Sequence, residues 1–198
     1  DDSVAPQFLE RCVTILDRDS SVVLCYARTR AVDEQGAVVR EFDPRDFDST
    51  EPHRRFCELV TTRHGHNAVF GVIRLSALRK TQMIGAFSSS DRSLLAELVL
   101  LGRFYEIPDF MFFKRHHSGQ HWRVYSTYEA REAWYDPRRA GKKTYRTWRI
   151  LQEYLRAIGR APLSLRERIS CCICLLPWMR RNRKRLYREL VPGRARSA

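Results

Sequence analysis

The residues best suited to chemistry open one segment, which reads GAFSSSDRS from Gly85 to Ser93. Beyond it, apolar residues recur at helical spacing and end at a glycine: Leu94, Leu95, Leu98, Leu101 and Gly102. We therefore expect a loop followed by a helix of about three turns. Asp91 then falls at or beside the helix N-cap, where free amide hydrogens and the helix dipole favour a carboxylate. The spacing alone leaves Asp91 open to two interpretations, a structural cap or a general base.

A second polar segment reads KRHHSGQHW at 114–122 and includes Arg115, His116 and His117. Paired histidines can bind zinc, but this segment has no acidic or cysteine neighbour at ligand spacing. Arginine and histidine are also donors to phosphate oxygens. We therefore expect this segment to bind a phosphate or to line a polar cleft.

The composition limits the class of protein. The chain has 198 residues, of which 43% are hydrophobic, enough for one globular domain with its own core. Of its six cysteines, three gather at Cys171, Cys172 and Cys174, a pattern that does not indicate a disulfide framework and favours a reducing compartment. No apolar run is long enough to span a bilayer. We expect a cytoplasmic protein, either free or peripheral at the inner face of the membrane.

The positive charge is concentrated near one end of the chain. The net charge is +13, and residues 160–198 hold eleven Arg or Lys against two Glu, so 11 − 2 = +9 of it lies there. A positive segment of this kind is attracted to phosphates, on an anionic membrane or on nucleic acid.

The elements that must position these residues alternate between helix and strand. A helix is expected after Pro6, with Phe8, Cys12 and Leu16 on one side, and the apolar run at 21–26 predicts a buried strand. The remaining elements expected before residue 115 are a hairpin partner at 37–42, a helix at 53–62, a strand at 67–74, a short helix at 76–80 and two short strands at 104–108 and 110–114. Gly71 is expected to mark a bulge or a close approach by a ligand.

From Ser126 onward the pattern is helical, with one helix at 144–158 and another at 165–176. The second helix carries the cysteine cluster and is followed by Trp178 and by basic residues at 180–185. An apolar segment beside a basic one is typical of an interfacial membrane anchor. It also fits a core-packed helix with a solvated basic end, and the sequence does not decide between the two.

Three segments together resemble a known family. The strands at 21–26 and 67–74, and above all the stretch SSDRSLLAELVLLGRFYEIP, look like the second half of a family 2 glycosyltransferase of the GT-A fold. The following FFKRHHSGQ resembles the arginine-histidine loop of that family. The likeness covers roughly residues 1–122. It implies a GT-A-like mixed α/β sheet flanked by helices, with a catalytic part at 1–124 and a basic helical extension at 125–198.

The resemblance also implies roles for particular residues. Asp1 and Asp2 look like the end of the acidic motif that holds a divalent metal, magnesium or manganese, with the sugar nucleotide. Asp91 matches the base that takes the proton of the acceptor hydroxyl in an inverting transfer. The residues that would contact the donor phosphates are Arg92, Arg115, His116 and His117. The implied partners are a nucleotide-sugar donor and an acceptor of unknown identity.

The chain departs from the family in two ways. The region that the family places before its acidic pair is absent from this sequence, and Ser90 stands where members often have an acidic residue. We expect either a fragment of a longer product or a remnant that has lost donor binding. The alternative function is a non-catalytic basic remnant that docks on an anionic membrane or on nucleic acid through its C-terminal tail. Of these two partners we expect the membrane, through residues 165–196, and not nucleic acid.

Overall fold

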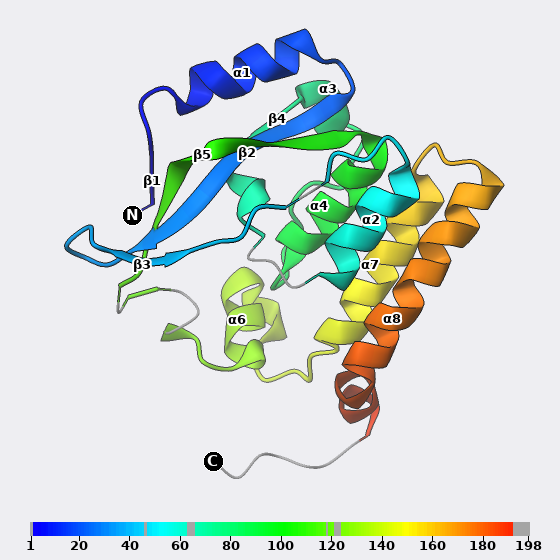
Figure 1. The fold of residues 1–198 in the computed structure, drawn as a ribbon. Coiled ribbons are helices and arrows are strands. Elements are labelled where there is room, and N and C mark those ends of the chain that lie inside the picture. Colours follow the sequence, from blue (N-terminus) through cyan, green and yellow to red (C-terminus); the bar gives the residue numbers. More distant parts are fainter. Residues whose placement is uncertain (1, 46, 63–65, 118, 121–123, 192–198) are drawn as a thin grey trace.

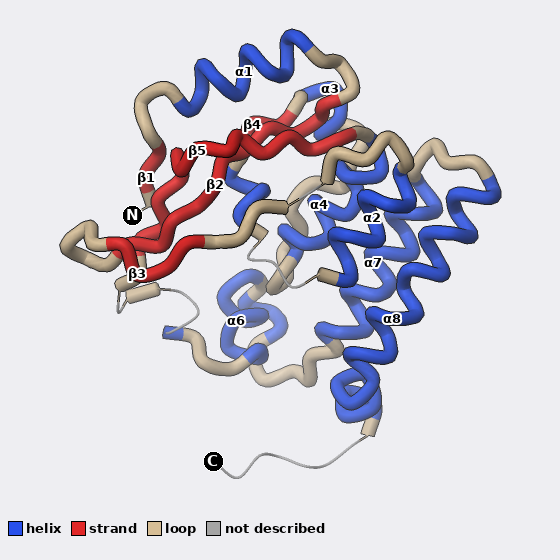
Figure 2. Tube along the Cα trace, in the orientation of Figure 1, coloured by secondary structure: helices blue, strands red, loops and turns tan. Residues whose placement is uncertain are grey.

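The computed structural model describes residues 2–45, 47–62, 66–117, 119–120 and 124–191, and its architecture is mixed α/β. One sheet contains β1 (Ser3–Val4), β5 (Arg103–Arg115), β2 (Val22–Val32) and β3 (Val38–Glu41) in that order, and β4 (Val72–Ile73) pairs with β2. The central strands β2 and β5 are parallel, and the other pairings are antiparallel. The expected mixed sheet flanked by helices is therefore present, as Figures 1 and 2 show.

The two faces of the sheet are covered very differently (Figure 1). On one face, α1 (Phe8–Arg18) packs Phe8, Cys12 and Leu16 against β2 and β5, which confirms the predicted amphipathic helix. On the other face lie α2 (Pro52–Thr61), α4 (Ser90–Leu101), α7 (Arg146–Arg160) and α8 (Leu165–Leu190). These four helices share one hydrophobic cluster with β2, so α7 and α8 pack into the same core as α4.

In the described part of the chain, the shorter helical elements are α3 (Leu75–Leu78), α6 (Tyr128–Tyr135) and the 3-10 turns η1 (Asn67–Phe70) and η2 (Pro137–Arg139). The predicted strand at 67–74 is thus wrong in its first half, which is η1, and only Val72 and Ile73 pair with β2. Gly71 allows that close pairing, because a Cβ there would lie 2.4 Å from the backbone oxygen of Cys25. The close approach expected at Gly71 is therefore made by β2.

The two short strands expected around Pro108 are one continuous strand, β5. In its register with β2, Ala27 pairs with Ile107 but Arg28 pairs with Phe110, so Pro108 and Asp109 form a bulge. Proline has no amide hydrogen for the ladder, which explains why the interruption falls there. The sequence signal was correct for the irregularity and wrong in treating it as a strand end.

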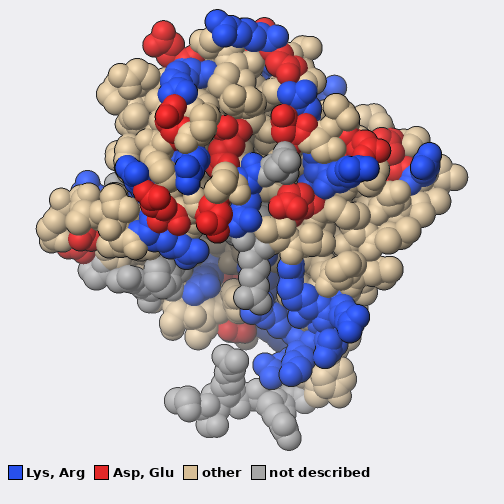
Figure 3. All heavy atoms as spheres, in the orientation of Figure 1, with Lys and Arg blue, Asp and Glu red and all other residues tan. Residues whose placement is uncertain are grey.

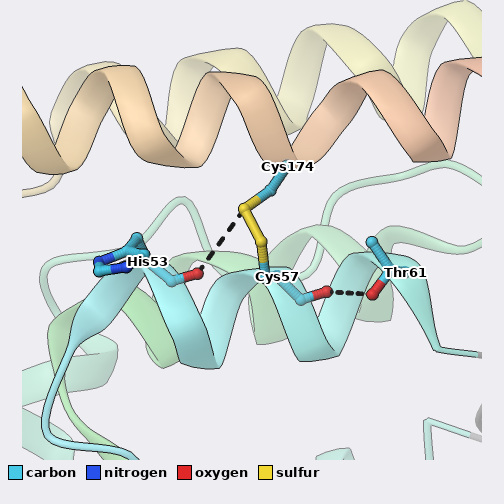
Figure 4. Close-up of a disulfide and its surroundings, with 4 residues drawn as sticks. All are labelled: His53, Cys57, Thr61 and Cys174. Atoms are coloured by element: carbon cyan, nitrogen blue, oxygen red, sulfur yellow. Dashed lines mark hydrogen bonds between the residues drawn. A yellow bond between two sulfur atoms is a disulfide. The ribbon is translucent and has the colours of Figure 1, made fainter.

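The helix α8 is longer than the 165–176 expected and packs against the core. Cys171, Cys174, Leu175 and Trp178 are buried in the large cluster, and Trp178 meets Tyr154 edge-on at 5.7 Å between ring centroids. Cys174 also forms a disulfide with Cys57 of α2, shown in Figure 4. The expectation that the cysteines form no disulfide is wrong for this pair, because the fold brings together two residues that lie 117 positions apart.

Candidate functional site

Asp91 lies in the first turn of α4, two residues beyond the N-cap position that the cap interpretation required. The N-cap residue is Ser89, whose backbone is left-handed with φ of 71° and whose side chain makes no capping hydrogen bond. The Oδ1 atom of Asp91 accepts a local hydrogen bond of 2.9 Å from the amide of Arg92. The carboxylate is half-buried and benefits from the positive end of the helix dipole. Its location fits both stabilisation of the turn and contact with a ligand.

The loop before α4 is held by residues from α6 and α7. Glu132 is 3% exposed and accepts a 2.9 Å hydrogen bond from the amide of Ser88, while Arg146 donates to Oγ of Ser89. Sequence reasoning missed both Glu132 and Arg146, because they follow the predicted site by more than 40 residues and no local pattern links them to it. Glutamate is rarely buried without a partner, so a prediction of burial at Glu132 could have indicated a structural or functional role.

The charges around Asp91 are concentrated in a partly desolvated space. Burial lowers the pKa of the Arg146 guanidinium, the nearby charge of Arg92 lowers it further, and the negative charge of Asp91 opposes the shift. The Nε atom of Arg146 is buried and has no hydrogen-bond partner in the part of the chain that the structure describes. Burial, followed by the charge of Asp91, raises the pKa of Tyr135. The first turn of α4 therefore combines one carboxylate with two neighbouring guanidinium groups.

A second group of predicted residues meets at the far end of β5. The Oδ1 atom of Asp2 accepts a 3.0 Å hydrogen bond from the amide of Arg115, and the amide of His116 donates to the backbone oxygen of Val32 at 2.7 Å. Arg115 is exposed, and His116 and His117 are half-buried. The structure thus brings the predicted metal ligand Asp2 together with the arginine-histidine segment.

Topology relates the two groups. β2 and β5 are parallel, and α4 leads directly into β5 through Gly102. A helix that precedes a parallel strand runs opposite to it, so the N-terminus of α4 faces the carboxyl edge of the sheet (Figure 1). Arg115 is the last residue of β5 and therefore lies at this edge, with Asp2 hydrogen-bonded to it. In open α/β sheets, ligands bind at this edge. The loop before Asp91 is hydrogen-bonded to side chains of α6 and α7, whereas Asp2 and Arg115 are hydrogen-bonded to each other at the strand ends. The two groups therefore share an edge of the sheet, but none of these hydrogen bonds joins them.

Of the two expected metal ligands, Asp1 and Asp2, the structure describes only Asp2. Asp1 lies outside the described residues, and Asp2 offers carboxylate oxygens of the kind that magnesium and manganese prefer. Its one hydrogen bond from Arg115 leaves other lone pairs for a cation. Among the residues that the structure describes, no three His, Cys, Asp or Glu side chains gather as a metal-binding cluster. The donor chemistry of Asp2 fits the expected metal.

Comparisons with known protein families and with curated proteins find no match to this chain. Within the described ranges, no helix is both long enough and apolar enough to cross a membrane.

Proposed function

We propose that this chain forms the acceptor-side part of a GT-A-like, inverting glycosyltransferase that moves a sugar from a nucleotide-sugar donor to an acceptor hydroxyl. The observation that carries the proposal is the hydrogen bond between Asp2 and the amide of Arg115 at the carboxyl edge of the parallel strands. That contact joins an acidic group to a basic segment where an α/β sheet binds its ligands. The family resemblance of both segments supports the same assignment.

In the proposed reaction, the acceptor oxygen attacks the anomeric carbon of the donor sugar, and the bond from that carbon to the nucleoside diphosphate breaks. Asp91 takes the proton of the acceptor hydroxyl. The positive charges of Arg92 and Arg115, with His116 and His117, would hold the departing diphosphate. A divalent metal held by the carboxylates of Asp1 and Asp2 would supply further positive charge for that group.

Two features of the Asp91 turn support this role. A general base needs lone pairs that are accessible to the acceptor, and the local hydrogen bond from Arg92 uses only part of the capacity of the carboxylate. The unpartnered Nε of Arg146 adds a buried donor beside it. Buried donors without partners are uncommon in folded proteins, and they often mark functional sites.

Donor binding and product formation test the proposal. The 198-residue chain should bind nucleotide-diphosphate sugars weakly or not at all in calorimetry with manganese, because the matched region lacks the family's base and ribose pocket. The longest gene product that contains this chain should transfer sugar from at least one donor in a panel. Tight, metal-dependent binding by the 198-residue chain would show that the donor pocket lies within it. Absence of transfer by the longest product with every donor would overturn the enzymatic proposal.

A second candidate function, docking on an anionic membrane, is favoured by the outer face of α8. Four apolar residues at helical spacing are strongly exposed there: Leu165 at 74%, Ile169 at 52%, Ile173 at 57% and Leu176 at 60%. Basic side chains follow in the next turns, and Figure 3 shows them gathered at the lower end of α8. Trp178 is buried in the core and is not part of this face. An apolar face followed by basic residues matches an interfacial helix.

Vesicle sedimentation tests the docking candidate. The chain should bind vesicles that contain phosphatidylserine and should not bind neutral phosphatidylcholine vesicles. Each basic residue near such a surface contributes about 1 kcal/mol, so Arg183→Ala should weaken binding roughly fivefold, and added salt should weaken it further. Arg138→Ala is the matched control, because Arg138 is also exposed but lies outside α8. Equal binding to both kinds of vesicle, or to neither, would remove this candidate.

A further inference from the structure

A cavity of about 310 Å³ lies between α4, α7 and the loop that leads into α4. The residues that decide its chemistry are Phe87, Ser93, Glu97, Glu153, Arg156 and Arg160. Small-molecule sites in proteins begin at about 300 Å³ and combine an apolar lining with a few placed polar groups. The cavity is therefore large enough for a small ligand.

One wall of the cavity contains a polar atom that lacks a partner. Ser93 is only 7% exposed, and its Oγ is buried with no hydrogen bond among the residues that the structure describes. A buried hydroxyl without a partner is unfavourable, because the group has lost its hydrogen bonds to water. The oxygen has almost no accessible surface of its own, so a ligand hydroxyl would reach it only after a small shift of the neighbouring side chains.

The charged groups of the cavity already balance one another. Glu97 is 7% exposed, and its two carboxylate oxygens accept from Arg160 and from the amide of Gln82. Glu153 accepts a 2.7 Å hydrogen bond from Arg156. Two carboxylates and two guanidinium groups leave no net charge for a ligand to neutralise. A charged ligand would have to compete with one of these ion pairs.

The remaining wall is aromatic and fixed in place. Phe87 is 5% exposed, and the guanidinium of Arg149 lies 3.9 Å from its ring centroid. An aromatic ring offers a flat apolar surface to carbon-bound hydrogens of a ligand. The cavity thus presents acceptors, donors and an apolar wall to one bound molecule.

We propose that this cavity binds a neutral polyhydroxylated molecule, such as a monosaccharide or a polyol. Hydroxyl groups are the ligand groups that donate to carboxylates and accept from guanidinium groups without adding charge. The site is distinct from the proposed reaction centre, because Ser93 follows Asp91 by two residues and the two side chains point about 160° apart around α4. The proposal therefore stands whether or not Asp91 is a catalytic base.

Nuclear magnetic resonance of the isotope-labelled chain tests the proposal, with glucose, galactose and glycerol as neutral probes and glucuronate and glucosamine as charged probes. A neutral hexose should shift the amide signals of Gln82, Phe87 and Ser93 in a saturable way. Arg156→Ala should weaken that binding about tenfold or more, as expected for loss of a hydrogen bond to a charged group. Arg156 is mostly exposed, so its removal should leave the fold intact.

A matched control keeps the result decisive. Arg138→Ala removes an exposed arginine outside the cavity and should leave hexose affinity unchanged. The proposal is overturned if no neutral probe shifts these amides, if the charged probes bind more tightly than the neutral ones, or if Arg156→Ala and Arg138→Ala have equal effects. Failure of sugar transfer, by contrast, would not alter any of these measurements.

Discussion

At the first turn of α8, Ser164 and Glu167 cap one another, whereas at the first turn of α4 the N-cap residue Ser89 makes no side-chain capping bond. The carboxylate of Glu167 accepts from both the amide and the hydroxyl of Ser164, at 3.0 and 2.8 Å. Asp91 in α4 accepts its local bond from the adjacent amide of Arg92. Both residues are carboxylates in a first helical turn, yet only Glu167 completes a cap. The difference shows that residue type and position alone do not separate a structural carboxylate from a candidate base.

The largest expected effect is that of Asp91→Asn on turnover. Asparagine keeps an oxygen for the Arg92 amide, so the loss of first-turn charge should cost only about 0.3–1 kcal/mol of stability. It cannot act as a base at neutral pH, so turnover should fall roughly 10²- to 10⁴-fold. The measurements are kcat in the longest gene product that contains this chain and the melting temperature.

The matched control for that change is Glu167→Gln, which makes the same replacement in the first turn of α8. It should leave kcat unchanged and lower the free energy of unfolding only slightly, because glutamine can still complete the capping box and only the first-turn charge is lost. If Asp91→Asn retains more than about a tenth of wild-type turnover, Asp91 is structural like Glu167 and the base lies elsewhere.

The next effect concerns the disulfide that ties α8 to α2 (Figure 4). Cys57→Ser should lower the free energy of unfolding by about 2–4 kcal/mol, because the unfolded chain is no longer constrained across a long loop. A reductant should have the same effect on the wild type and no further effect on the variant. Cys172→Ser is the matched control, since that cysteine is exposed and free. Equal stability of Cys57→Ser and Cys172→Ser would show that the cross-link does not hold α8.

Several elements could be predicted from local patterns. The apolar run at 21–26 predicted the central strand, the leucine spacing predicted α4, and the hairpin partner expected at 37–42 corresponds to β3, which pairs with β2. These signals are strong because the apolar residues of each buried face lie close together in the sequence at a regular spacing. The end of α4 at Gly102 was also correct, although its reason differs. The φ of Gly102 is −175°, and a Cβ there would lie 2.3 Å from the side chain of Val23.

The features that sequence could not supply are those made by long-range contacts. The partners of the Asp91 loop, Glu132 and Arg146, come from helices that the sequence assigned to an extension. The disulfide joins Cys57 to a cysteine cluster that looked self-contained. The meeting of Asp2 with Arg115 was implied only by the family resemblance. Each of these three contacts depends on how α6, α7, α8 and the strand ends pack together. The spacing of residues within a short segment carries no information about that packing.

A smaller effect is expected for Ser164→Ala. Removing the hydroxyl leaves the Glu167 amide without its capping acceptor and should lower the free energy of unfolding by about 1 kcal/mol. Ser170→Ala is the control within the same helix, and it should be neutral or slightly stabilising because alanine is the better interior helix former. Chemical denaturation of the three proteins gives the comparison. Equal losses from the two variants would mean that the capping box contributes no stability of its own.

The smallest expected effect is the pH dependence of this cap. The hydroxyl of Ser164, followed by its backbone amide, holds the pKa of Glu167 below the ordinary glutamate value. A depressed pKa in the folded state means that the stability from this carboxylate is present above its unfolded pKa, about 4.3, and is lost as pH falls through the folded value. Glu167→Gln has no such titration. The difference in unfolding free energy between wild type and Glu167→Gln should therefore shrink on acidification from about pH 6 to pH 3. A difference that stays constant or grows over that range would show that the ionised carboxylate of Glu167 does not stabilise the cap of α8. The contrast between the first turns of α8 and α4 would then fail.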